Sequence, residues 1–197
     1  ALAVADPARR RHGLHGLADR LESAQSAILA ANAEDLEAAS GLDAARQDRM
    51  RMDAGRLAQI ARTVREVAAQ PDPLAEKEDL GTRPSGIRVQ RVRSPLGLVA
   101  MIYEARPNVT IDAAALAVYA GNAIVLRPGR EIRATSQAFG RAIAEALAEA
   151  GLPSEAVLVL DDPERAWFKS LLAAAGVVDV LIPRGGESLS LAVQAEA

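Results

Sequence analysis

Three short segments place polar residues directly before a predicted helix, and two of them combine arginine with glycine. They are residues 103–108, 127–131 and 183–187. Each follows an apolar run that predicts a strand, and ligands of open parallel sheets bind at the carboxyl ends of the strands. Free N–H groups at a helix start and guanidinium groups both favour phosphate. These segments therefore predict a nucleotide ligand.

Two familiar phosphate-binding motifs are missing from the sequence. Neither GxGxxG nor GxxxxGK[ST] occurs, so any nucleotide must be held by another arrangement of residues. His12 and His15 lie three residues apart on the first predicted helix, but a metal site needs at least a third ligand. No metal site is predicted.

The elements that must position these segments alternate along the second half of the chain. Strands are predicted over 98–103, 123–126, 156–160 and 178–182, and helices over 109–120, 133–150, 164–175 and from 187. Continuously apolar strands separated by helices are typical of a parallel sheet covered on both faces. The fold class predicted is therefore α/β.

The first part of the chain reads as helical. Asp6-Pro7 is a cap and first turn for one helix, a second helix ends near Ser40, and Asp53 caps a third that Pro71 terminates. From Gly86 the apolar period changes to two, with a turn over 94–97, and this predicts a strand pair.

Composition excludes several functional classes. The 197 residues carry 23 Lys and Arg against 26 Asp and Glu, a net charge of −3, with 3% aromatic residues and no Cys. Nucleic-acid binding is not expected from this balance. With no membrane span or leader recognisable, we expect a cytoplasmic protein. The absence of Cys excludes a thiol nucleophile within these residues. Because the sequence starts without Met and ends in a polar run, we expect a fragment.

Four strings in this sequence resemble the gamma-glutamyl phosphate reductase (glutamate-5-semialdehyde dehydrogenase) family of the aldehyde dehydrogenase superfamily. They are Ser-Pro-Leu-Gly at 94–97, Ile-Tyr-Glu-Ala-Arg-Pro-Asn-Val-Thr at 102–110, Gly-Asn-Ala-Ile-Val-Leu-Arg at 121–127 and Ile-Pro-Arg-Gly-Gly at 182–186. The resemblance implies a Rossmann-like parallel sheet of the aldehyde dehydrogenase type with an N-terminal helical layer. It also implies a separate catalytic domain with a nucleophilic cysteine, which these residues do not include.

The activity implied by the resemblance is NADPH-dependent reduction of L-glutamate 5-phosphate to L-glutamate 5-semialdehyde, with release of phosphate, in proline biosynthesis. The chain resembles the cofactor-binding part. Residues 1–85 would form a helical segment packed on the cofactor domain, and residues 86–197 an incomplete NADP-binding α/β domain. Glutamate 5-kinase is an implied partner, and the full-length protein is expected to be a homo-oligomer.

The resemblance also assigns roles to residues. Asn108 matches the asparagine whose amide stabilises the oxyanion, and Arg106 is a candidate for the substrate's phosphate or carboxylate. The candidates for cofactor binding are Tyr103, Glu104, Arg127, Arg130, Glu131, Arg184, Gly185 and Gly186. From spacing alone, Asn108 could instead cap a helix, Tyr103 could belong to the core, and the glycines could form a plain helix entry.

Other functions remain open at this point. The family usually has Gly where this chain has Pro128, which bears on the choice between NADPH and NADH. The alternatives are another aldehyde dehydrogenase, the reductase half of a bifunctional pyrroline-carboxylate synthase, and a non-catalytic nucleotide-binding fragment.

Overall fold

The N-terminal part of the chain is helical, as predicted. The computed structural model describes residues 2–161, 171, 173–174 and 176–196. After a short 3-10 helix, η1 (Leu2–Val4), come α1 (Pro7–Ser23), α2 (Gln25–Ala38), α3 (Ala44–Met50) and α4 (Ala54–Ala68). Asp6 and Asp53 cap α1 and α4, each accepting a hydrogen bond from a first-turn N–H. Helix α3 was not predicted from the sequence; Asp43 caps it by accepting a hydrogen bond from the backbone N–H of Arg46 at 2.9 Å.

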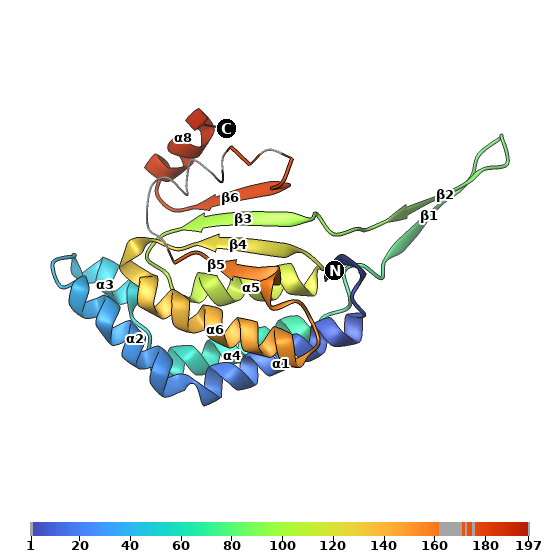
Figure 1. Cartoon of the computed structure of the whole chain (residues 1–197). Helices are drawn as coiled ribbons and strands as arrows, with labels where there is room; N and C mark the ends of the chain where they lie inside the picture. Colours follow the sequence, from blue (N-terminus) through green and yellow to red (C-terminus); the bar gives the residue numbers. More distant parts are fainter. Residues whose placement is uncertain (1, 162–170, 172, 175, 197) are drawn as a thin grey trace.

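A long hairpin follows, and its pairing differs from the prediction. Strand β2 (Arg88–Val92) pairs antiparallel with the preceding β1 (Lys77–Thr82), and the residues after the 94–97 turn belong to another sheet. β1 is almost wholly polar, so it shows no apolar alternation that could signal a strand. Ion pairs across the strands, Asp79–Arg88 at 2.7 Å and Glu78–Arg91 at 2.9 Å, join them instead. The hairpin extends away from the body (Figure 1).

A four-stranded parallel sheet forms the centre of the second part. Its strands are β3 (Leu98–Tyr103), β4 (Ala123–Arg127), β5 (Val157–Val159) and β6 (Val180–Arg184), in the order β5-β4-β3-β6. The connecting helices are α5 (Asn108–Tyr119) and α6 (Arg133–Glu149), with 3-10 turns η2 (Arg130–Ile132) and η3 (Ser154–Ala156), and α8 (Glu187–Glu196) follows β6. The predicted α/β class is confirmed. The helix predicted over 164–175 lies largely outside the described residues.

The molecule has three layers (Figure 1). Helices α5 and α6 cover one face of the sheet, and α1, α2 and α4 pack beneath them. The core between the layers is apolar, with Leu21, Ile111 and Phe139 fully buried. Arg10 is also buried, and it is paired: it donates to the carbonyl of Tyr119 at 2.7 Å and to the carboxylate of Asp72.

The arrangement leaves the carboxyl ends of β3, β4 and β6 at one edge of the sheet, beside α2 and α3. The predicted division between residues 85 and 86 falls in the turn of the β1–β2 hairpin and stays a prediction. No helix in the described part of the chain combines the length and the apolar character needed to cross a membrane.

Candidate functional site

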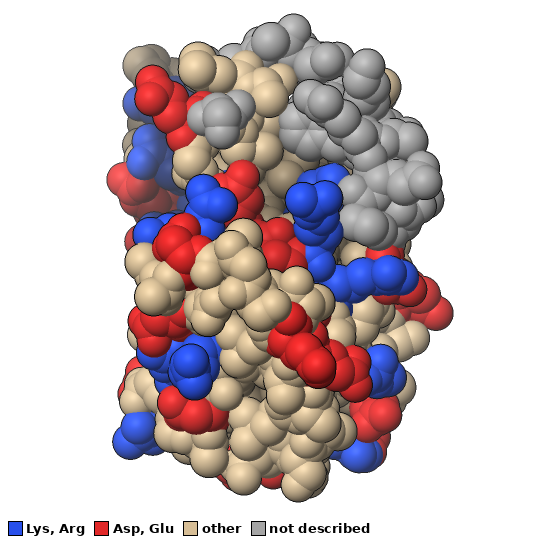
Figure 2. Space-filling view, turned by 90° about the vertical axis from the view of Figure 1, so that its left-hand side faces the viewer, with Lys and Arg blue, Asp and Glu red and all other residues tan. Residues whose placement is uncertain are grey.

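A cleft of about 1160 Å³ lies at the carboxyl edge of the sheet. Figure 2 looks onto this edge, where basic and acidic side chains interleave. β3 lies between β4, the next strand along the chain, and β6, so the edge includes the point where the strand order reverses. Such switch points are where open α/β sheets bind ligands. The cleft lining includes nine of the ten predicted site residues: Tyr103, Glu104, Arg106, Arg127, Arg130, Glu131, Arg184, Gly185 and Gly186.

Tyr103 ends β3 with its side chain in the core. Its exposed fraction is 1%, and its hydroxyl lies 2.7 Å from the hydroxyl of Thr110. Burial raises the pKa of Tyr103 to about 12, so the phenol stays protonated at neutral pH. At this position, therefore, only main-chain atoms can contact a ligand in the cleft.

The backbone turns sharply just after β3. Ala105 has a φ of +45°, in the left-handed region that costs a residue with a Cβ about 1 kcal/mol. Its N–H donates to the carboxylate of Glu131 at 2.8 Å, which fixes this turn against η2. A Cβ on Gly129 would clash with the same carboxylate, so glycine leaves room for Glu131.

We expect Gly129→Ala to displace the Glu131 carboxylate from Ala105. The φ of Gly129 is −62°, so alanine introduces no backbone strain, and Gly→Ala alone usually stabilises. The matched control is Gly41→Ala, where a Cβ meets nothing within 4 Å. In urea denaturation, the free energy of unfolding of the Gly129→Ala protein should be about 1 kcal/mol lower than that of the Gly41→Ala protein. The difference should vanish in a Glu131→Ala background, and its persistence there would contradict this account.

Glu104 connects the ends of β3 and β6. Its carboxylate accepts a hydrogen bond at 3.2 Å from the backbone N–H of Gly186, at the start of α8. A Cβ on Gly185 would lie 2.7 Å from that carboxylate, so this close approach requires glycine. The two glycines thus let the backbone approach an anion closely, and in this structure that anion is the carboxylate of Glu104.

The start of α6 is already occupied. Asp35 of α2 is buried and accepts hydrogen bonds from the N–H groups of Ala134 and Thr135, at 3.0 and 2.8 Å, and from the Thr135 hydroxyl at 2.6 Å. A carboxylate here satisfies the free N–H groups and the positive end of the helix. The N–H groups of Ala134 and Thr135 are therefore not available to a phosphate in the cleft.

Arginine is the predominant charged residue of the cleft. Seven arginines and three carboxylates line it, an excess of four positive charges: Arg46, Arg49, Arg106, Arg127, Arg130, Arg133 and Arg184 against Asp35, Glu104 and Glu131. Arg133 pairs with Asp161 at 2.8 Å, and Arg46 with Asp43 at 3.3 Å. Three of these arginines were not predicted as site residues: Arg46 and Arg49 lie on α3, which was not predicted, and Arg133 was interpreted only as the start of a helix.

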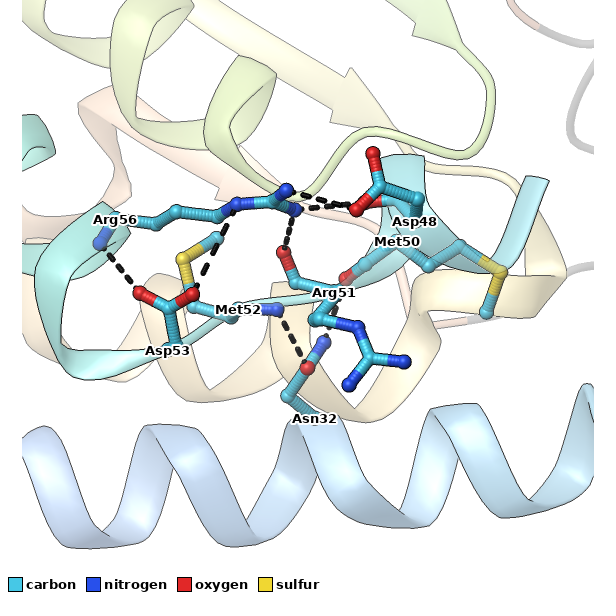
Figure 3. A network of polar contacts seen from close by, with 7 residues as sticks. All are labelled: Asn32, Asp48, Met50, Arg51, Met52, Asp53 and Arg56. Carbon is cyan, nitrogen blue, oxygen red and sulfur yellow. Dashed lines mark hydrogen bonds and ion pairs between the residues drawn. The ribbon is translucent and has the colours of Figure 1, made fainter. Parts of the chain in front are cut away.

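A buried amide fixes α3 beside the cleft (Figure 3). Asn32 of α2 donates to the carbonyl of Met50 at 2.8 Å and accepts from the N–H of Met52 at 2.7 Å. Arg56 adds bonds to the carbonyl of Arg51 and to the carboxylate of Asp48, both at 2.8 Å. Asn32 and Arg56 therefore both bind the link between α3 and α4. This fixes α3, from which Arg46 and Arg49 face the cleft.

Asn108 is the predicted site residue that does not line this cleft. It is the first residue of α5, half-buried, and its side chain makes no capping hydrogen bond. Its amide Nδ2 instead donates to Asp112, one turn along the helix, at 2.9 Å. The alternative of an N-cap is therefore not what the structure shows.

Within the described residues, His, Cys, Asp and Glu side chains nowhere gather in the group of three that a metal would need.

These features define a Rossmann-like α/β domain with a basic cleft at its switch point. A model of the aldehyde dehydrogenase family matches residues 3–189, and the chain belongs to this family. Its members use nicotinamide cofactors.

Within this family, the chain is similar to proteins that share one name. The chain is 49% identical over 194 residues to gamma-glutamyl phosphate reductase of Nitratidesulfovibrio vulgaris (strain DP4), covering 98% of this chain and 46% of that protein. It is 46% identical to the enzyme of the same name from Caulobacter sp. (strain K31), covering 100% and 48%. The structure matches gamma-glutamyl phosphate reductase from Thermotoga maritima with a TM-score of 0.95 and 31% identity, covering 100% of this chain and 48% of that one. The resemblance read from the sequence is confirmed. The chain spans about half the length of these relatives.

Proposed function

We propose that this chain forms the NADPH-binding part of a gamma-glutamyl phosphate reductase, which reduces L-glutamate 5-phosphate to L-glutamate 5-semialdehyde with release of phosphate. The observation that carries the proposal is the convergence of nine predicted residues in one basic cleft at the switch point. The similarity to reductases of that name supports the choice of substrate.

The cleft suits a dinucleotide phosphate. Its volume, about 1160 Å³, is somewhat above the usual range for ligand pockets, and its excess of positive charge complements several phosphates. The turn at Gly185 and Gly186 would hold the pyrophosphate in place of the Glu104 carboxylate, with Arg184 as counter-charge. Arg127 and Arg130 would bind the adenosine ribose and its 2′-phosphate. NADPH, when bound, supplies the reducing equivalents.

Two residues are assigned to the substrate. Arg106 is exposed at the edge of the cleft and would bind a phosphate or carboxylate through its planar guanidinium group. Asn108 would donate its amide N–H to the oxygen on which negative charge develops. The nucleophile implied by the family reaction is a cysteine, and these 197 residues contain none. Glutamate 5-kinase as a partner, homo-oligomer formation and a cytoplasmic location stay predictions.

The proposal is tested by assaying the intact protein in the reverse direction. Phosphate-dependent reduction of NADP by L-glutamate 5-semialdehyde is the expected result. Activity that requires CoA, or that does not need phosphate, would indicate another aldehyde dehydrogenase. Binding of NADPH without turnover would indicate a non-catalytic protein. The mass of the intact polypeptide separates these cases further, because a value near 20.7 kDa leaves no room for a catalytic domain and a value about twice as large would include one. A kinase domain fused to the same chain would indicate the bifunctional synthase.

The arginines of α3 give a prediction on cofactor choice. Arg46→Gln with Arg49→Gln should weaken NADPH binding roughly five-fold and NADH binding less, because two positive charges are removed from the cleft and only NADPH carries the additional 2′-phosphate. Titration calorimetry at low salt measures both affinities. Arg141→Gln on α6 is the matched control, since Arg141 is exposed and lies outside the cleft lining. Equal weakening of NADPH and NADH would show that the two arginines of α3 do not act on the 2′-phosphate.

A further inference from the structure

Asn108 and Asp112 form a side-chain pair on the first two turns of α5. Residues four apart lie on the same face of a helix, and the Asn108 Nδ2 to Asp112 Oδ2 distance is 2.9 Å. Both side chains are half-buried, where a hydrogen bond is less exposed to competition from water. Arg184, at the end of β6, acts electrostatically on the same carboxylate.

The chemistry of the two groups fixes which way the amide points. A carboxamide has an oxygen acceptor on one side and two N–H donors on the other, and the two ends have nearly the same shape. An ionised carboxylate only accepts hydrogen bonds, so it favours the rotamer that turns Nδ2 towards it. The opposite rotamer would place the Asn108 oxygen against a carboxylate oxygen.

The surroundings of Asp112 both stabilise and destabilise its charged form. Burial raises its pKa above the ordinary value, while the hydrogen bond from Asn108 and the charge of Arg184 act in the opposite direction. The groups that stabilise the carboxylate are thus the amide that it orients and an arginine of the cleft.

We infer that Asp112 is a positioning residue, which holds the second N–H of Asn108 in the direction from which it stabilises the developing oxyanion. This inference rests on the proposed function. A donor must face the place where the charge develops, and a misplacement of about 1 Å costs up to 100-fold in rate. Asp112 itself need not touch the substrate.

The test is a double-mutant cycle in the intact protein. Asp112→Leu removes the acceptor, keeps the same number of side-chain heavy atoms and should lower kcat about ten-fold, with KM unchanged within about two-fold. Asp112→Asn retains an oxygen acceptor but can also turn a donor towards Asn108, so it should lower kcat by only about three-fold, less than Asp112→Leu does. In an Asn108→Ala background, Asp112→Leu should lower kcat by less than about two-fold, because the group that it orients is gone. Leu116→Ala, one turn further along α5 and 59% exposed, is the control for changes to the helix.

The outcomes separate the inference from the proposed function. Multiplicative effects of the two substitutions would overturn the positioning role, as would a rise in KM at constant kcat, which would mean direct contact with the substrate. A normal kcat for Asn108→Ala would overturn both the oxyanion role and the positioning role, while leaving the reductase reaction intact. A wild-type protein without reductase activity would refute the proposed function itself.

Discussion

Replacing Asn108 by alanine in the intact protein is expected to lower kcat of the proposed reductase reaction about one hundred-fold, as loss of an oxyanion donor does elsewhere. The fold should be little affected, since the side chain makes no capping hydrogen bond and its partner, Asp112, keeps the favourable charge of Arg184. KM for the substrate should change much less than kcat, because the interaction strengthens only as charge develops on the reacting oxygen.

Asn122→Ala is the matched control for this experiment. Asn122 is buried at the opposite, amino edge of the sheet, where its oxygen accepts from the N–H of Gly97 at 3.1 Å. Its replacement should cost about 1 kcal/mol of unfolding free energy and leave kcat nearly normal. If Asn108→Ala behaves like Asn122→Ala, the amide of Asn108 has a structural role only. Steady-state kinetics and thermal unfolding of both variants distinguish the two cases.

Much of the sheet edge could be predicted because its signals are local. An apolar run followed by polar residues and a helix pattern marks the end of a parallel strand, and parallel strands all end at the same edge. Glu104, Arg127 and Arg184 were placed in one site on that basis and on the family strings, and the structure brings them together. Their roles towards a ligand stay predictions.

The features that sequence analysis missed depend on contacts between distant segments. α3 did carry a local signal, since Asp43 precedes it as a cap, but seven residues with few apolar positions gave no periodicity. The hydrogen bonds of Asn32 and Asp35 to Thr135 span about one hundred residues, so neither residue could be distinguished from the solvated face of a helix. The polar strand β1 is likewise defined by its partner rather than by its own pattern.

We expect Asp35→Ala to be the most destabilising of the single substitutions considered. It removes the acceptor of three hydrogen bonds at the start of α6 and leaves the donors of Ala134 and Thr135 in a largely buried place. Unsatisfied buried donors and a lost helix cap together predict a loss of about 3 kcal/mol in unfolding free energy. For a chain of this size the melting temperature should fall by roughly 10 °C.

Two other aspartates at helix starts provide the comparison for Asp35. Asp43 and Asp53 each accept one backbone hydrogen bond, at 2.9 and 2.8 Å, and both are exposed. Asp43→Ala and Asp53→Ala should therefore each cost only about 1 kcal/mol. Replacing Asp43 or Asp53 removes only the cap of the helix that follows it. Asp35 also joins α2 to α6, so its removal weakens the packing of the helical layer on the sheet domain. If the three substitutions proved equally costly, Asp35 would be an ordinary cap without this joining role.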